Sequence, residues 1–228
     1  MTRTDLILLG AGGNVHDVLD IVDAINADEG QFNVLGALDD RRARGERHLN
    51  LEILGGLASC TDFPGARFIS TIHNEHVYRL YPTLLARLGL SPNRFVTLIH
   101  PGAGLSRRAE IGRGVYICDG ASIAGGVVIG DHVSVGPHAI VGHDSRVDSY
   151  SVLAAGALLG GGVHVERACY IGSSASIRPE LVVRREALVG LGAVVVRDVP
   201  RASVVVGNPA RPLTGSDLKY ERHIQGVM

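Results

Sequence analysis

The chain lacks tryptophan, has few aromatic residues and carries almost no net charge. Aromatic residues make up 4% of its 228 residues, charged residues make up 20%, and the formal net charge at pH 7 is −1. Such a balance does not favour a general nucleic-acid or polyanion binder. The apolar runs are shorter than the roughly 18 residues that a transmembrane helix needs. We therefore expect no nucleic-acid partner and no membrane insertion.

Cysteine is also scarce. Cys60, Cys118 and Cys169 are an odd number without CxxC spacing, which predicts neither a disulfide framework nor a zinc knuckle. The first apolar segment is only five residues long, too short for the apolar region of a secretory signal peptide. Hydrophobic residues nevertheless make up 46% of the chain. We expect a cytoplasmic protein with a substantial core.

From residue 99 onward, an aliphatic residue recurs every six positions. Between Ile99 and Val195, all seventeen such positions hold Ile, Leu or Val, and the residue four places later is Ala, Val, Ser, Cys or, once, Leu. A period of six fits neither an α-helix nor a simple alternating strand. It is typical of a short strand followed by a tight corner, whose stacked units bury a continuous core. The pattern predicts a parallel β-helix with no large loop between residues 99 and 199.

This hexapeptide pattern resembles the hexapeptide-repeat acyltransferases. The resemblance implies a left-handed β-helix in which three hexapeptides form one triangular coil. The left hand follows from the resemblance alone, because ordinary crossover chirality would favour a right hand.

The first 95 residues follow a βαβ pattern instead. We predict a strand at Asp5–Leu9, a glycine turn at residues 10–13, a helix with an apolar face over residues 15–25, and a strand at Asn33–Leu38 that ends at Asp39-Asp40. Backbone N–H groups at the start of a helix favour an anion, but the turn lacks the third glycine of the dinucleotide fingerprint. Taken separately, the turn and the acidic pair also have purely structural explanations. Together they indicate a nucleotide-sized ligand.

The remaining elements complete an α/β amino-terminal part. A strand is predicted at residues 68–72, an amphipathic helix interrupted by Pro82 at residues 77–88, and a lead into the β-helix at residues 94–99. We expect a Rossmann-like domain, a β-helix domain and a polar carboxyl-terminal tail: residues 1–95, 96–213 and 214–228.

His143 has a distinctive place in the repeat. In a coil of three hexapeptides it lies at a corner, stacked between Gly125 and Gly161. A histidine between glycines has open space around it, as a reactive imidazole needs, and Asp144 next to it would orient the ring and increase its basicity. The alternative is an exposed corner histidine that happens to precede an acid.

A metal site is the main rival interpretation. His138 and His143 form an H-x4-H pair, which raises the possibility of a zinc hydratase of the γ-carbonic anhydrase type. A third ligand is needed, but His100 is out of stacking register with His143, and His132 lies on a different side of the prism. We therefore expect no metal.

Five motifs occur along the chain in an order that resembles the NeuD/PglD family of bacterial sugar O- and N-acyltransferases. The resemblance covers nearly the whole chain, up to about Leu213. The motifs are Gly10-Ala11-Gly12-Gly13, Leu38-Asp39-Asp40, Ile99-His100-Pro101, Gly142-His143-Asp144-Ser145 and Val205-Val206-Gly207-Asn208-Pro209-Ala210.

The resemblance implies roles for individual residues. The catalytic base of the family falls on His143, and the acid that increases its basicity falls on Asp144. The substrate-binding positions, which hold a nucleotide sugar on the α/β domain, fall on Gly12, Gly13, Asn14, Asp39, Asp40 and His73. The acetyl-CoA positions, in a groove between two β-helices of a homotrimer, fall on Val152, Gly161, Ser173 and Leu191. We expect the last three of these on one corner line.

Three positions depart from the family. Asn14 and Val152 stand where the family has histidine, and His73 stands where it has a glycine near the nucleotide sugar. The first and last changes concern how the sugar docks, and the change at Val152 removes a hydrogen bond to the acyl-CoA.

The resemblance implies an acetyl-CoA-dependent N-acetyltransferase of polysaccharide biosynthesis that acts on a nucleotide-linked amino sugar. His143 would accept the proton of the attacking amine, and backbone near Gly161 would stabilise the oxyanion. We interpret Cys118 and Cys169 as small residues of the repeat that lie in the core, so we expect direct transfer without a covalent enzyme intermediate. O-acetylation of a sugar of the sialic acid type and a non-catalytic scaffold remain alternatives.

Overall fold

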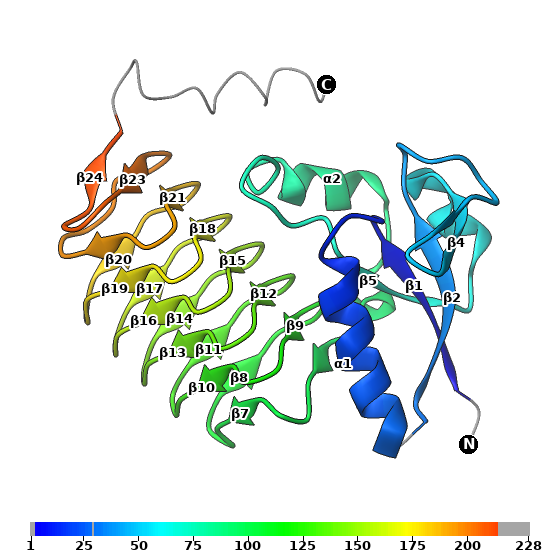
Figure 1. Cartoon of the computed structure of the whole chain (residues 1–228), viewed down its shortest axis with the longest axis horizontal. Coiled ribbons are helices and arrows are strands. Elements are labelled where there is room, and N and C mark those ends of the chain that lie inside the picture. Colours follow the sequence, from blue (N-terminus) through cyan, green and yellow to red (C-terminus); the bar gives the residue numbers. More distant parts are fainter. Residues whose placement is uncertain (1–2, 29, 214–228) are drawn as a thin grey trace.

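The computed structural model describes residues 3–28 and 30–213, so the predicted tail at 214–228 lies outside the described residues. The chain forms an α/β part followed by a stack of coils (Figure 1). No helix among the described residues is long and apolar enough to cross a membrane.

The amino-terminal part is built on one five-stranded sheet in the order β3-β4-β2-β1-β5. The β1–β2, β1–β5 and β2–β4 pairs are parallel, and only the short edge pair β3–β4 is antiparallel. The strands are β1 (Thr4–Leu9), β2 (Phe32–Leu38), β3 (Arg47–His48), β4 (Leu51–Gly55) and β5 (Arg67–Ser70). The helices are α1 (Val15–Asp28) and α2 (Tyr81–Arg87), and the 3₁₀ helices are η1 (Leu57–Asp62) and η2 (Pro92–Arg94).

Proline sets the start of α2. The sequence predicted a helix from residue 77 interrupted at Pro82, but α2 begins at Tyr81, and the residues before it form a turn. Proline is tolerated in the first turn of a helix, where its missing N–H has no partner within the helix. Pro82 therefore belongs to the beginning of this helix and does not interrupt it.

The rest of the chain is a parallel β-helix with three flat faces. Face 1 consists of β7 (Gly104–Leu105), β10 (Ser122–Ile123), β13 (Ile140–Val141), β16 (Leu158–Leu159), β19 (Ser176–Ile177) and β22 (Val194–Val195). Face 2 consists of β8 (Glu110–Ile111), β11 (Val128–Ile129), β14 (Arg146–Val147), β17 (His164–Val165) and β20 (Val182–Val183). Face 3 consists of β6 (Leu98–Ile99), β9 (Tyr116–Ile117), β12 (Ser134–Val135), β15 (Val152–Leu153), β18 (Tyr170–Ile171), β21 (Leu188–Val189), β23 (Val204–Val206) and β24 (Arg211–Pro212).

The strand register confirms the predicted coil of three hexapeptides. Ile140 pairs with Leu158, and Arg146 pairs with His164, so each strand lies against the strand three hexapeptides further along the chain. The aliphatic residues of the repeat point inward and form one core, from which water is excluded. Ser145 and Ser151 take small-residue positions in this core, and their hydroxyl groups donate to the carbonyls of Gly160 and Glu166. Because these buried hydroxyl groups have hydrogen-bond partners, their burial destabilises the fold little.

Face 3 of the β-helix packs against the amino-terminal part. Val15 and Val18 of α1 share a buried cluster with Leu98 and Tyr116. The turn before α2 adds hydrogen bonds: Arg79 donates to the carbonyls of Glu186 at 2.9 Å and Ala202 at 3.0 Å. Glu186 lies between β20 and β21 and Ala202 lies just before β23, so this turn contacts the last coils of the β-helix.

Candidate active site

His143 lies at the corner between faces 1 and 2, after β13 and before β14. Its side chain is 75% exposed, and its Nδ1 lies 2.9 Å from Oδ2 of Asp144. An ionised carboxylate can only accept a hydrogen bond, so Nδ1 is the donor. In the neutral ring, Nε2 then carries the free lone pair and faces away from Asp144. This is the arrangement that a general base requires.

Gly161, one coil further on, makes room for this ring. A Cβ built at Gly161 would lie 2.6 Å from Nε2 of His143, closer than any real contact. At Gly125, one coil earlier, a Cβ would meet only Ser106 at 3.5 Å and Arg108 at 4.0 Å. The ring therefore leans over Gly161, and the predicted open space between two glycines is used on one side only.

The acetyl-CoA positions predicted from the resemblance do not share one corner. Gly161 lies on the corner line of His143, between faces 1 and 2, whereas Ser173 and Leu191 lie on the corner line between faces 3 and 1. The expectation of a single line was wrong, because residues share a corner only when whole coils of three hexapeptides separate them, and Ser173 follows Gly161 by only two hexapeptides. Val152 lies on face 3 and is buried, with 6% exposure.

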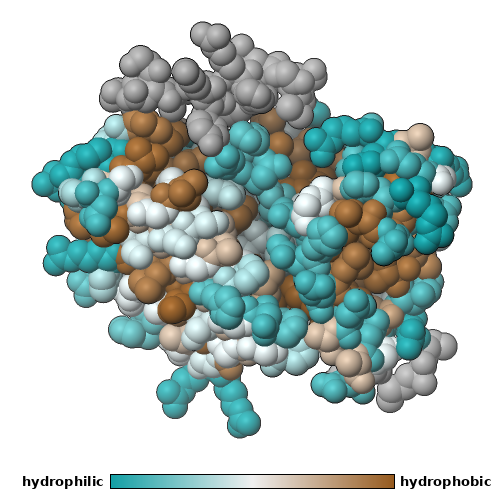
Figure 2. All heavy atoms as spheres, viewed as in Figure 1, coloured by the Kyte–Doolittle hydropathy of each residue, from teal (hydrophilic) through white to brown (hydrophobic). Residues whose placement is uncertain are grey.

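Face 1 separates these two corner lines and carries apolar side chains on its outer surface. Ile140 and Leu158, which are paired in register, are 44% and 39% exposed, and Leu191 at the edge of this face is 76% exposed. Figure 2 shows brown apolar patches over the β-helix, interrupted by paler and teal residues. Within one chain, the two corner lines therefore lie at opposite edges of a partly apolar face.

Apart from the His143 corner, a hollow lies at the carboxyl ends of β1 and β2. It has a volume of about 560 Å³, and no atom lies within 4 Å of a Cβ built at Gly12 or Gly13. Of the six predicted substrate residues, only these two glycines line it. The lining residues are Ala11, Gly12, Gly13, His16, Arg41, Arg42, His48 and Leu49.

The two predicted aspartates hold the loops around this hollow. Asp39 is buried and accepts hydrogen bonds from the backbone N–H groups of Ala11 and Arg41, both at 2.8 Å. Asp40 accepts from the N–H of Leu57 at 2.7 Å, at the start of η1. The carboxylate of Asp39 thus fixes the glycine turn and the loop that begins at Arg41, and the carboxylate of Asp40 fixes the start of η1.

His73 lies in the interior and does not line the hollow. Its Nε2 donates to the carbonyl of Ser70 at 3.0 Å, and its ring packs against Tyr81 and Tyr116. Burial lowers the pKa of His73 from 6.5 to about 4, so the ring is neutral. Asn14 donates to the carbonyls of Thr71 and His73. These two residues therefore fix the chain after β5.

The predicted substrate residues did not include five side chains that line this hollow: His16, Arg41, Arg42, His48 and Leu49. Arg42 and His48 approach to 3.0 Å, and Arg41 is almost fully exposed. The only available signal was that Arg41-Arg42 directly follow the acidic pair Asp39-Asp40 in the sequence. His48 gave no signal, because β3 comes near the glycine turn only in the folded chain.

The rival chemistries find little support among the described residues. Residues 3–28 and 30–213 contain no group of three or more His, Cys, Asp or Glu side chains able to hold a metal ion. His132 is largely buried and stacks on Tyr150 at 5.1 Å. Cys118 and Cys169 are buried as predicted, and burial raises the pKa of both thiols to about 12. Thiols of this kind are poor nucleophiles at neutral pH.

The repeat and the fold define a class of protein. A family profile described as "Bacterial transferase hexapeptide (six repeats)" matches residues 108–143 and 126–161. The acetyltransferase domain of PglB from Neisseria gonorrhoeae is 30% identical, with a TM-score of 0.80, over 92% of this chain and 100% of that one. The chain is therefore a transferase of the hexapeptide-repeat class.

Two further structures narrow the family. Perosamine N-acetyltransferase from Caulobacter crescentus, solved as a histidine-to-asparagine mutant with CoA and GDP-perosamine, is 25% identical over 94% of this chain and 99% of that one, with a TM-score of 0.82. WeeI from Acinetobacter baumannii is 27% identical over 93% and 100%, with a TM-score of 0.75. The chain belongs to the NeuD/PglD-like group of sugar acyltransferases. The predictions of this family, of a left-handed β-helix and of an acyltransferase are confirmed.

Proposed function

We propose that the protein transfers the acetyl group of acetyl-CoA to the amino group of a nucleotide-linked amino sugar, with His143 as general base. The observation that carries this proposal is the exposed His143–Asp144 pair, with Nε2 free above Gly161. The ligands of two relatives support it: acetyl-CoA in the PglB domain, and CoA with GDP-perosamine in the Caulobacter enzyme.

The chemistry follows from this geometry. The amine attacks the thioester carbonyl, a C–N bond forms, and Nε2 of His143 takes the proton that the nitrogen loses. The tetrahedral intermediate then expels the CoA thiolate, which His143 can protonate. General base catalysis of this kind contributes about 10²–10⁴-fold. The N–H of Gly161 is our candidate donor to the oxyanion, because the N–H groups on either side of it already donate to the carbonyls of Ile177 and His143.

We assign the nucleotide to the hollow beside the glycine turn, on a Rossmann-like unit formed by β1, α1 and β2. The start of α1 and the exposed Arg41 favour an anion there. Gly12 and Gly13 allow phosphate to approach the backbone. In this proposal, Asp39, Asp40, Asn14 and His73 shape the pocket by holding its loops. This assignment also divides the chain functionally at about residue 95, into a nucleotide-sugar domain and a transfer domain.

The acetyl-CoA site needs a second copy of the chain. Gly161 and the pair Ser173 and Leu191 lie at opposite edges of face 1. A cyclic homotrimer with face 1 turned towards its axis would bring the His143 corner of one copy next to the Ser173 corner of its neighbour. The exposed apolar side chains of face 1 support this arrangement. Val152 is buried on face 3, so in this arrangement it would contribute by packing and would not contact the acetyl-CoA directly.

The test is release of the CoA thiol from acetyl-CoA in the presence of nucleotide-linked amino sugars and their hydroxyl analogues. We expect turnover with the amino sugars only; turnover with the hydroxyl analogues would instead establish the O-acetyltransferase. His143→Ala should lower kcat by about 10²–10⁴-fold and leave the assembly intact. Near-normal activity of His143→Ala would reject the assigned base.

A further inference from the structure

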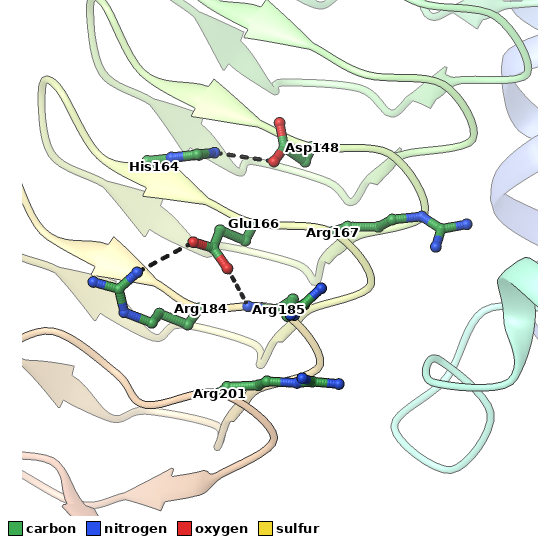
Figure 3. A pocket seen from close by; sticks show the side chains of 7 residues that line it. All are labelled: Asp148, His164, Glu166, Arg167, Arg184, Arg185 and Arg201. Atoms are coloured by element: carbon green, nitrogen blue, oxygen red, sulfur yellow. Dashed lines mark hydrogen bonds and ion pairs between the residues drawn. The ribbon is translucent and has the colours of Figure 1, made fainter.

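The third corner of the β-helix, between faces 2 and 3, carries three arginines in stacked positions (Figure 3). Arg167 and Arg185 lie one full coil apart, and Arg201 is in register with Arg185, because Ala202 donates to the Arg185 carbonyl and Leu188 pairs with Val204. Neighbouring strands lie about 4.8 Å apart, so the three side chains leave successive coils one above another. We call Arg167, Arg185 and Arg201 the arginine ladder.

The ladder lines a pocket of about 480 Å³, together with Asp148, His164, Glu166 and Arg184. All three ladder side chains are exposed, and in Figure 3 they point to the same side, towards the amino-terminal part. A cation–π contact holds Arg167 in place, with its guanidinium 4.8 Å from the ring centre of Tyr150. The site is therefore a pocket whose three ladder side chains are accessible to solvent.

Both carboxylates of the pocket already have partners other than the guanidinium groups of the ladder. Asp148 pairs with Arg146 at 2.6 Å and with His164 at 3.0 Å. Glu166 pairs with Arg184 at 3.4 Å, and its second oxygen accepts the backbone N–H of Arg185 at 2.8 Å.

The positive charges of the ladder are only partly neutralised by carboxylates. Arg201 reaches Glu186 at 3.4 Å, but no carboxylate of residues 3–28 and 30–213 lies within 4.0 Å of the guanidinium of Arg167 or Arg185. Like charges on adjacent strands repel each other. A rigid scaffold that holds them together therefore offers a site for an anion.

We propose that the arginine ladder binds an oligophosphate, a small molecule with two or more linked phosphoryl groups. Guanidinium groups bind phosphate oxygens in pairs of parallel hydrogen bonds. Guanidiniums on successive coils can each take a different phosphoryl group of one ligand. The volume of the pocket suits a small molecule.

This site is separate from the proposed acetyl-transfer site. His143 and Gly161 lie at one edge of face 1, and Ser173 and Leu191 lie at the other. The ladder lies at the one corner that face 1 does not touch. The inference therefore does not depend on the proposed function.

Isothermal titration calorimetry with inorganic triphosphate tests the proposal. We expect the wild-type protein to bind triphosphate, and Arg167→Gln and Arg185→Gln each to weaken binding by at least about tenfold, because charge-assisted hydrogen bonds are lost. Arg185→Lys, which keeps the charge but not the paired hydrogen bonds, should bind with intermediate affinity. The matched control is Arg113→Gln, because Arg113 is exposed at the same corner, three coils before Arg167. This substitution should leave the affinity for triphosphate unchanged.

Two further arms complete the experiment. Binding should weaken as salt rises, and it should persist in saturating CoA. Absence of binding, equal affinity in the wild type and both ladder variants, or displacement by CoA would each overturn the proposal. A circular dichroism spectrum equal to that of the wild type shows that the variants are folded.

Discussion

Replacing Gly161 with alanine tests the position of the His143 ring without touching the ring itself. The new methyl carbon would lie 2.6 Å from Nε2, 2.7 Å from Cε1 and 3.1 Å from Cδ2 of His143. Ordinary contacts begin at 3.4 Å, so the ring must move by about 1 Å. The atom under most pressure is the nitrogen that we assign as the base.

The expected loss is large in rate and small in stability. A displacement of about 1 Å in a reacting group can cost about 10²-fold in rate, so we expect kcat for acetyl transfer to fall by about that factor. The His143 side chain is 75% exposed and can swing into solvent without disturbing the core. Gly161 also lies outside the left-handed backbone region, so alanine adds no backbone strain, and the melting temperature should change by only a degree or two.

Gly125→Ala is the matched control. Gly125 lies at the same corner, one coil before His143, but its methyl group would make only ordinary contacts, at 3.5 and 4.0 Å. Both variants are assayed by thiol release from acetyl-CoA, with melting curves recorded in parallel. If Gly161→Ala kept wild-type kcat, or if both variants lost activity equally, the assignment of Nε2 as the reacting atom would be refuted.

Three further predictions follow from particular contacts. Asp144→Asn keeps the left-handed backbone conformation, which asparagine tolerates, but removes the charge behind Nδ1. We expect kcat to fall by about tenfold, less than for a buried triad aspartate, and an unchanged kcat would contradict the role of Asp144. For His73, whose pKa is about 4 in the folded protein against 6.5 normally, the unfolded chain binds a proton that the folded chain rejects. The free energy of unfolding should therefore fall by about 3 kcal/mol as the pH drops from 6.5 to 4. Urea titrations should show a smaller fall in His73→Gln; equal falls would refute this origin. Ile140→Glu places a charge on face 1, so light scattering should show a mass below three times 24.0 kDa, whereas a monomeric wild type would refute the trimer.

The sequence alone determined the β-helix and the corner that holds His143. Each coil rests on the next one along the chain, three hexapeptides away, so the neighbours of His143 can be counted from the sequence, as Gly161 shows. Asp144 is adjacent in sequence, and its contact with the ring needs no long-range folding. The burial of Cys169 could be predicted for the same reason, because a fixed period assigns its position to the inside. Cys118 directly follows the repeat residue Ile117 and is buried by the contact with the amino-terminal part instead.

How separate segments of the chain meet could not be predicted from the repeat. The sequence put His73 near the substrate, but the contact between the amino-terminal part and face 3 encloses its ring between Tyr81 and Tyr116. The last coil is two residues shorter than the others, so Arg201 stacks on Arg185 although only 16 residues separate them. A strict period of six residues does not predict this contact. Periodicity describes contacts between neighbouring coils; contacts between unlike segments depend on how side chains far apart in the chain fill space together, and these had to be read from the folded molecule.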